Sequence, residues 1–219
     1  FARELMELFL LGVGNYTEDD VVAVARAWTG HGTVDYRTAE YRFRPEQHDD
    51  GAKTLFGITR NWDGPQVIDE ILYGARREVA ARFLARKLWT FFAHERPTDA
   101  IVEAVAQAFL AADLDIRSAL RVIFNRPEFR SLEARQGLVR SPIEYVVAVR
   151  HAFGVPCAEL HPDWTLGLMG QVPFNPPNVS GWRPNGRGCR SSSRRWRCAP
   201  ATPARRTARP PPGGRPTCA

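Results

Sequence analysis

Residues 77–93, which read REVAARFLARKLWTFFA, predict a long helix. Apolar side chains recur there at intervals of three or four residues, at Val79, Phe83, Leu84, Leu88 and Phe91. This spacing places them on one face of a helix, where they would form a core stripe. Neither Gly nor Pro interrupts the run, so the pattern favours one continuous helix inside a mainly α-helical fold.

Segments with helical periodicity continue on both sides of this stretch. Residues 2–11 carry Leu5, Leu8 and Phe9 on one face, and Thr17 with Asp20 is typical of the start of a second helix. Further helices are predicted from Pro65, after Pro97, over 115–124, over 141–153 and around 164–169. Together these elements indicate a multi-helix globular domain.

Residues 33–60 depart from the helical pattern. Tyr41 and Phe43 alternate with polar residues, and so do Thr54 and Phe56. Asp50-Gly51 lies between the two runs and is typical of a tight turn. The sequence therefore predicts a small β-hairpin near residues 41–58, with its tip at 48–51.

The composition changes abruptly after Gly186. Residues 187–219 contain nine arginines, no acidic residue and one large apolar side chain, Trp196. Taking those nine from the 30 basic residues leaves 21 against 24 acidic residues, so residues 1–186 have a net charge of −3. We expect a helical domain at 1–186 and a disordered low-complexity tail at 187–219. The domain has no overall charge excess that would attract nucleic acid or an anionic membrane.

Two interpretations of the tail remain open. It is either an arginine-rich arm that binds nucleic acid through phosphates, or the out-of-frame translation of GC-rich DNA. We favour the frameshift, because a genuine arm would mix lysine with arginine and carry some acidic residues. The chain also begins at Phe1 inside an apparent helix, which predicts that it is a fragment of a longer protein.

Cysteine content and hydropathy add two constraints. Three of the four cysteines lie in the tail, so Cys157 has no partner for an internal disulfide in the domain. No apolar run approaches the ~20 residues that cross a bilayer as a helix, so no transmembrane segment is predicted in this fragment.

The first helix offers one candidate for catalysis. Glu4 and Glu7 are three residues apart, so their carboxylates share a helix face. Two such carboxylates can hold a divalent metal or divide the roles of acid and base. The alternative is a solvated face on which Arg3 pairs with Glu7.

The expected hairpin tip offers a second candidate. His48 and Asp49 could share a metal, or the carboxylate could orient the imidazole as a general base, with Lys53 stabilising an anion. The alternative is a polar turn in which Asp49 bonds the local backbone. The metal is unknown, and a divalent metal is the only cofactor that these residues suggest. Residues 1–186 lack paired His or Cys ligand motifs, so a closed zinc site is unsupported.

Further candidate binding residues lie elsewhere. Arg86 and Lys87 could bind an anion beside Trp89, although a core position for Trp89 is the competing interpretation. Gln171 and Trp182 flank a Pro-rich segment that cannot be regular helix and should lie extended on the surface. The nucleophile elbow, the phosphate-binding loop and the dinucleotide fingerprint are all absent from the sequence.

Ordered motifs across residues 1–184 resemble the bacterial domain-of-unknown-function 1800 family. They lie at 2–8, 11–17, 27–30, 43–45, 48–57, 85–89, 141–145 and 169–182. The resemblance implies bacterial origin, a largely helical fold and a longer N-terminal side, but no activity. Relatives tend to be encoded beside a second family related to sulfatases and phosphatases, and many are exported. By that analogy we expect an extracytoplasmic role with a partner protein.

Three functions follow as hypotheses. The favoured one is a non-enzymatic binding or scaffold domain that acts with a partner protein. The second is a metal-assisted or acid-base hydrolase that uses Glu4, Glu7, His48 and Asp49, which would have to converge in one pocket. The third is nucleic-acid binding through the tail, and it applies only if the tail is genuine.

Overall fold

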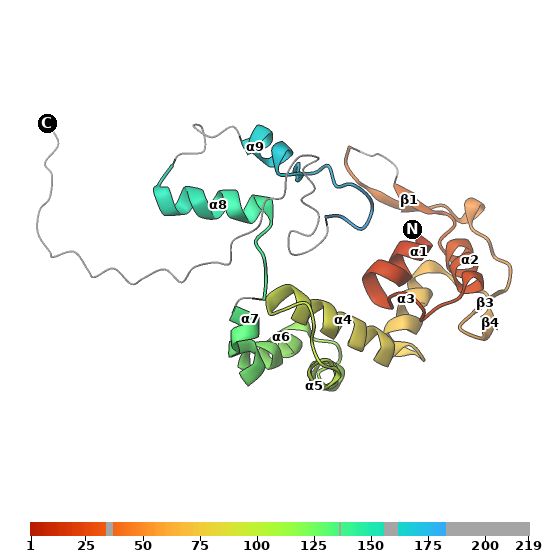
Figure 1. Cartoon of the computed structure of the whole chain (residues 1–219). Helices are drawn as coiled ribbons and strands as arrows, with labels where there is room; N and C mark the ends of the chain where they lie inside the picture. Colours follow the sequence, from red (N-terminus) through yellow and green to blue (C-terminus); the bar gives the residue numbers. More distant parts are fainter. Residues whose placement is uncertain (34–36, 136, 156–161, 183–219) are drawn as a thin grey trace, which may run out of the picture.

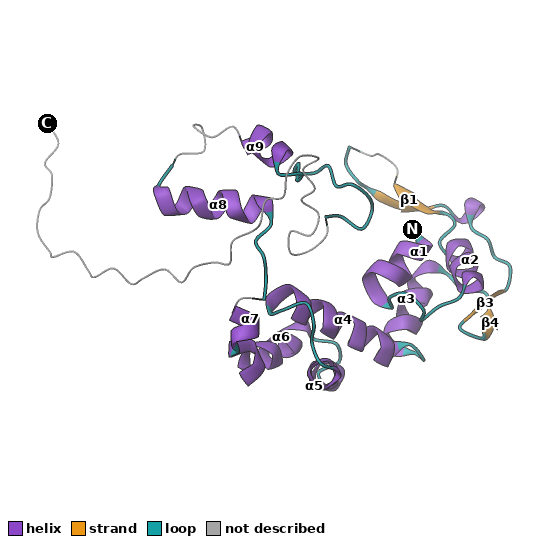
Figure 2. Ribbon diagram, viewed as in Figure 1, coloured by secondary structure: helices purple, strands orange, loops and turns teal. Residues whose placement is uncertain are grey.

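The computed structural model describes residues 1–33, 37–135, 137–155 and 162–182, and helices dominate this part of the chain (Figures 1 and 2). The N-terminal elements are α1 (Ala2–Glu4), the π-helix η1 (Leu5–Leu10), α2 (Glu18–Ala27), β1 (His31–Thr33), β2 (Tyr41–Phe43), the 3-10 helix η2 (Pro45–Gln47), β3 (Lys53–Leu55), β4 (Ile58–Arg60) and α3 (Gly64–Tyr73). They are followed by α4 (Arg77–Phe92), α5 (Asp99–Ala111), α6 (Ile116–Asn125), the 3-10 helix η3 (Pro127–Arg130), α7 (Leu132–Arg135), α8 (Pro142–Phe153) and α9 (Pro162–Leu168). The mainly helical fold expected from the sequence is confirmed.

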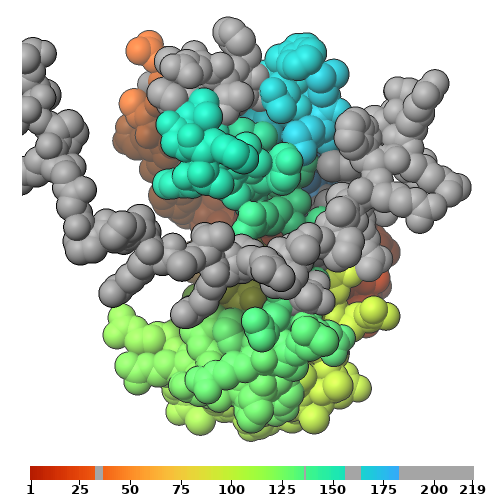
Figure 3. Space-filling view, turned by 60° about the vertical axis from the view of Figure 1, so that its left-hand side comes forward, coloured from red at the N-terminus to blue at the C-terminus, as the bar shows by residue number. Residues whose placement is uncertain are grey.

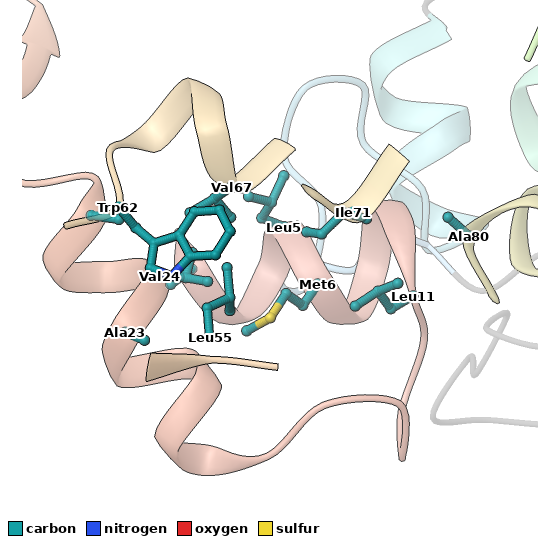
Figure 4. Packing of buried hydrophobic residues seen from close by; sticks show 12 residues of the cluster. Leu5, Met6, Leu11, Ala23, Val24, Leu55, Trp62, Val67, Ile71 and Ala80 are labelled. Atoms are coloured by element: carbon teal, nitrogen blue, oxygen red, sulfur yellow. The ribbon is translucent and has the colours of Figure 1, made fainter. Parts of the chain in front are cut away.

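Helix α4 connects two hydrophobic cores. The first core lies among η1, α2, β3, α3 and the start of α4, and it includes Met6, Val24, Leu55 and Trp62. Figure 4 shows these side chains pointing toward one another between the elements. The second core lies between the rest of α4 and helices α5 and α6 (Figure 1). One long helix therefore holds the two halves of this region together.

The expected core stripe of α4 is wrong in its phase. Its fully buried side chains are Ala80, Ala81, Ala85 and Trp89. Phe91 is 73% exposed, and the other four residues of the expected stripe are only partly buried. Helix α4 makes its largest contact with α5, and small alanine side chains allow two helices to approach closely. Close packing by small residues has displaced the larger apolar side chains to the margins of the interface.

The first helix also differs from the simple pattern. Residues 5–10 form a π-helix, and the amides of Leu11 and Gly12 both donate to the carbonyl of Met6. This wider turn changes which side chains face inward. Leu5, Met6 and Leu11 are buried, whereas Phe9, which the α-helical spacing placed in the core, is exposed.

The structure contains two hairpins where one was expected. Strand β1 pairs antiparallel with β2, with His31 opposite Phe43. Strand β3 pairs antiparallel with β4, with Leu55 opposite Ile58. Phe56 and Gly57 form the second turn, and both have positive φ, as a two-residue hairpin turn favours. Residues 48–51 are therefore not a hairpin tip but part of the connection between the two hairpins.

Capping residues begin the helices as expected. Thr17 with Asp20 and Ser141 with Glu144 form complete capping boxes at α2 and α8. A third box, Asp63 with Gln66, begins α3 and was not anticipated. None of the helices in the described ranges is long and apolar enough to cross a bilayer.

Helices α8 and α9 follow a connecting stretch and pack against each other (Figure 1). The side-chain oxygen of Gln171 accepts a hydrogen bond from the Ile143 amide at 3.2 Å, which joins residues after α9 to the first turn of α8. Cys157, Trp196 and the whole arginine-rich segment 187–219 lie outside the described residues.

Candidate functional site

The loop at residues 48–51 is attached to the C-terminal end of α2. The Nδ1 atom of His48 lies 2.9 Å from the carbonyl oxygen of Thr29, and the Asp49 amide donates to the Thr29 hydroxyl at 2.8 Å. A carbonyl can only accept, so Nδ1 carries the proton in the neutral tautomer. The Nε2 atom of the His48 ring is then left as a lone-pair nitrogen.

Asp49 is held by two guanidinium contacts. Arg26 Nε lies 2.6 Å from one carboxylate oxygen, and Nη2 lies 3.1 Å from the other. The Gly51 amide donates a third hydrogen bond to this carboxylate at 2.8 Å. Arg26 first, and then the Gly51 amide, lower the pKa of Asp49 to about 2. Asp49 is therefore ionised at neutral pH, and its carboxylate accepts three hydrogen bonds from protein donors.

Lys53 is the most deeply buried charged side chain of this region, with 1% exposure. Its ammonium donates to the Asp49 carbonyl, to the Gly51 carbonyl at 2.9 Å and to the Asn61 side-chain oxygen at 2.9 Å. Burial lowers the pKa of Lys53, since the charged form loses hydration. Three oxygen acceptors match the three N–H donors of an ammonium. The Lys53 ammonium thus links Asp49, Gly51 and Asn61, and it does not line the surface hollow beside α2.

The carboxylates of the first helix have partners of their own. The Glu7 carboxylate accepts from the Tyr16 hydroxyl at 2.8 Å, and the Glu4 carboxylate lies 3.0 Å from the Phe1 amino group. Arg3 forms a two-pronged ion pair with Glu18, at 2.8 and 2.6 Å, so the alternative pairing of Arg3 with Glu7 is wrong. The π-helical turn and the following loop bring Tyr16 and Glu18 to this face.

Glu4, Glu7, His48 and Asp49 do not line the surface hollow beside α2. That hollow has a volume of about 660 Å³ and lies between α2 and the β3–β4 hairpin, where Asp20, Arg26, Phe56 and Arg76 contribute to its walls. Within the described ranges, no group of three His, Cys, Asp or Glu side chains is placed to hold a metal ion. The catalytic and metal assignments therefore stay predictions.

An aromatic cluster around His31 is the feature that the sequence did not reveal. The His31 ring lies 4.8 Å from that of Trp28, 4.7 Å from that of Phe43 and 6.3 Å from that of His48, measured between centroids. Its Nδ1 is 2.8 Å from the Tyr41 hydroxyl, and its Nε2 is buried without a hydrogen-bond partner. Burial first, and then the neighbouring His48, lower the pKa of His31. The pairing of β1 with β2 creates this cluster, and no local signal announces that pairing.

A comparison with known families confirms the resemblance that the sequence motifs indicated. A family described as a protein of unknown function (DUF1800) matches residues 1–206. The chain belongs to the DUF1800 family. The match continues beyond Gly186, and the out-of-frame interpretation of the last segment stays a prediction. No curated protein and no solved structure matches the chain.

The DUF1800 resemblance rested partly on 48–57, and the structure gives this stretch a structural role. His48, Asp49 and Lys53 each contact backbone or a buried partner, so together they hold the loop against α2. The turn at Phe56-Gly57 follows, and the Phe56 amide donates to the buried Asp20 carboxylate at 2.8 Å. These contacts account for the residue types in the stretch without invoking catalysis.

The remaining candidate binding residues of this DUF1800 chain lie apart from that loop. Arg86 pairs with Asp99 at 3.0 Å, and the Lys87 ammonium donates to the Leu8 carbonyl at 2.6 Å. Trp89 is fully buried, which agrees with the core interpretation and leaves no ring face for a ligand. Gln171 bonds to the start of α8, and Trp182 is partly buried at the end of the last described range.

Proposed function

We propose that this DUF1800 chain is a non-enzymatic binding domain that acts with a partner protein. The supporting observation is the surface of residues 164–179. Its exposed large apolar side chains are those of Trp164, Leu168, Val172, Phe174 and Val179, and Leu166 is the one fully buried residue in the described part of this segment. A group of exposed apolar side chains in one short segment favours a protein-interaction surface.

Phe174 adds a second line of support. Its side chain has no cover at all, at 101% exposure, and its backbone has a φ of 62°. A bulky residue rarely adopts this left-handed conformation, which costs of order 1–3 kcal/mol and persists where the surroundings or the function require it. The backbone conformation belongs to a turn, since the Asn175 amide donates to the Val172 carbonyl at 3.1 Å and Pro173 precedes Phe174. The exposure of the ring is not offset by any contact among the described residues. A partner that covers the phenyl ring would supply the missing burial.

None of the residues of this segment belongs to either of the two hydrophobic cores. In Figure 3 the turquoise and blue residues of α8 and α9 lie above the green helices of the second core. A partner could contact this segment without disturbing the packed helices of the cores. This arrangement favours a docking role for 164–179.

The test is co-purification of the full-length gene product from its native host. We expect a stoichiometric partner that is recovered with the wild type and lost from the double variant Phe174→Ser and Val179→Ser. The matched control is Val22→Ser with Ile58→Ser, two exposed apolar residues on α2 and β4. Both double variants should keep the wild-type unfolding midpoint, because all four side chains are solvent-accessible. Recovery of no stoichiometric partner, or equal recovery with both double variants, would contradict the proposal.

A further inference from the structure

Four phenylalanines form a continuous ladder across three elements of the second half. Phe91 and Phe92 end α4, Phe124 lies near the end of α6, and Phe129 lies in η3. Successive ring centroids are 4.8, 5.3 and 5.2 Å apart, and each pair packs edge to face. Such pairs stabilise each other beyond the area that they bury. The ladder is therefore a defined surface feature with fixed ring positions.

The ladder begins in the core and ends in solvent. Phe129 packs against the second core, whereas Phe92 and Phe124 are exposed and Phe91 is the most exposed of the four. Leu132 of α7 and Ile116 of α6 are also exposed. A folded monomer gains nothing by leaving rings of this size in water, so the outer end of the ladder suits a partner that covers it.

Arginines flank the ladder. Arg117, Arg121 and Phe124 lie four and three residues apart on α6 and so share one face, and Arg130 directly follows Phe129. All three arginines are exposed, and Arg121 and Arg130 form no ion pair within the ranges that the structure covers. By contrast, Arg77, Arg82 and Arg86 on α4 are each paired with a carboxylate.

The local charge is opposite to that of the rest of the domain. Residues 116–140 contain six arginines and two glutamates, a net charge of +4, whereas residues 1–186 together carry −3. A local positive surface on an otherwise acidic domain is complementary to a negatively charged partner segment.

We propose that the ladder formed by Phe91, Phe92, Phe124 and Phe129 docks an acidic amphipathic helix of a partner protein. Apolar side chains of that helix cover Phe91 and Phe124, and its carboxylates pair with Arg121 and Arg130. The inference rests on the proposed function in one respect, because both require a protein partner. It concerns a surface distinct from 164–179 and adds the chemistry of what binds there.

The ring geometry favours a helix over single-stranded nucleic acid. Bases stack on ring faces, and a platform for several bases needs faces that are accessible in sequence. Here the interplanar angles are 82°, 83° and 66°, so successive rings present faces and edges in turn. Knob-like edges of this kind fit between the apolar side chains that a helix projects at three- and four-residue intervals.

The experiment uses the full chain and a synthetic fluorescent helix. The probe carries Leu and Phe at helical spacing with Glu at the flanking positions, and a second peptide replaces every Glu by Gln. A single-stranded RNA of matched charge is the third ligand. Binding to wild type, Phe91→Ser and Arg121→Glu is measured by fluorescence anisotropy at low and moderate salt. Tyr73→Ser and Arg42→Glu are the controls, since both residues are exposed on elements outside the ladder.

We expect both ladder variants to weaken binding of the Glu peptide by about tenfold or more, as removal of an interface anchor does. The control variants should bind as wild type does, and the Gln peptide should bind more weakly and with less salt dependence. No binding of the Glu peptide, equal binding by the ladder variants, or tighter binding of the RNA would overturn the inference. A partner recovered through Phe174 in the absence of peptide binding would overturn this inference alone.

Discussion

Arg26 and Asp49 are 23 residues apart in sequence and form a two-pronged ion pair, with Nε and Nη2 at 2.6 and 3.1 Å from the two carboxylate oxygens. The pair joins the last turn of α2 to the loop before β3. The same loop is also held by Thr29 and Lys53, so contacts from three residues fix its position beside α2.

Replacing Lys53 should destabilise the fold more than any other single change in this loop. Lys53→Met keeps the length of the side chain but removes the donor that three oxygen acceptors share. We expect the free energy of unfolding to fall by about 3 kcal/mol in urea titrations. Arg42→Met, at an exposed position of β2, should change it little. Equal effects of the two substitutions would show that the ammonium does not hold the loop.

The ion pair of Asp49 should make stability depend on acidic pH. The pKa of Asp49 is lowered to about 2 in the folded chain, against about 3.9 in an unfolded one. The contribution is therefore complete above the unfolded value and is lost as the pH falls toward 2. Asp49→Asn should lower the urea midpoint at neutral pH and converge with wild type in strong acid. Asp69→Asn, at an exposed position of α3, is the control and should match wild type throughout.

Gly64 should not tolerate a side chain. A Cβ atom at this position would lie 2.6 Å from the Trp28 ring, closer than two carbon atoms can approach. Gly64→Ala therefore requires the indole or the start of α3 to move, which costs about 1–3 kcal/mol of unfolding free energy. Gly167→Ala in α9 is the matched control, since the nearest atom there is 4.0 Å away. Thermal unfolding of both variants measures the difference, and an unchanged midpoint for Gly64→Ala would refute the close contact.

Two aromatic residues at the end of α4 should contribute very differently to the free energy of unfolding. Trp89→Ala removes a fully buried ring from the second core and should cost about 3–5 kcal/mol. Phe91→Ala removes an exposed ring two residues later and should cost no more than about 1 kcal/mol, the loss of one edge-to-face pair. Denaturant titrations compare the unfolding free energies of the two variants and so show which face of α4 is buried. A large loss for Phe91→Ala would restore the stripe expected from apolar spacing.

The sequence alone predicted the features that depend on neighbouring residues, above all where helices begin. The capping boxes at Thr17 and Ser141 satisfy amides within four residues, so their effect depends on local sequence alone. The helical class and membership of the DUF1800 family were also predicted from the sequence, and both are confirmed. The candidate residues His48 and Asp49 were found as a motif, but their partners at the end of α2 and just after it could not be anticipated, since those lie about 20 residues away in the sequence.

Long-range packing settled the rest. Whether Phe91 or Trp89 of α4 faces inward depends on α5, which packs against the alanines of α4. The spacing of apolar residues within α4 does not show which face α5 will cover. Likewise, His31 joins His48 only because β1 pairs with β2, and Phe124 continues the ladder of α4 only because α6 ends beside it. Local hydrogen bonds specify where a helix begins. Whether a side chain is buried depends on a second element that covers it, so burial is decided only when both elements have packed together.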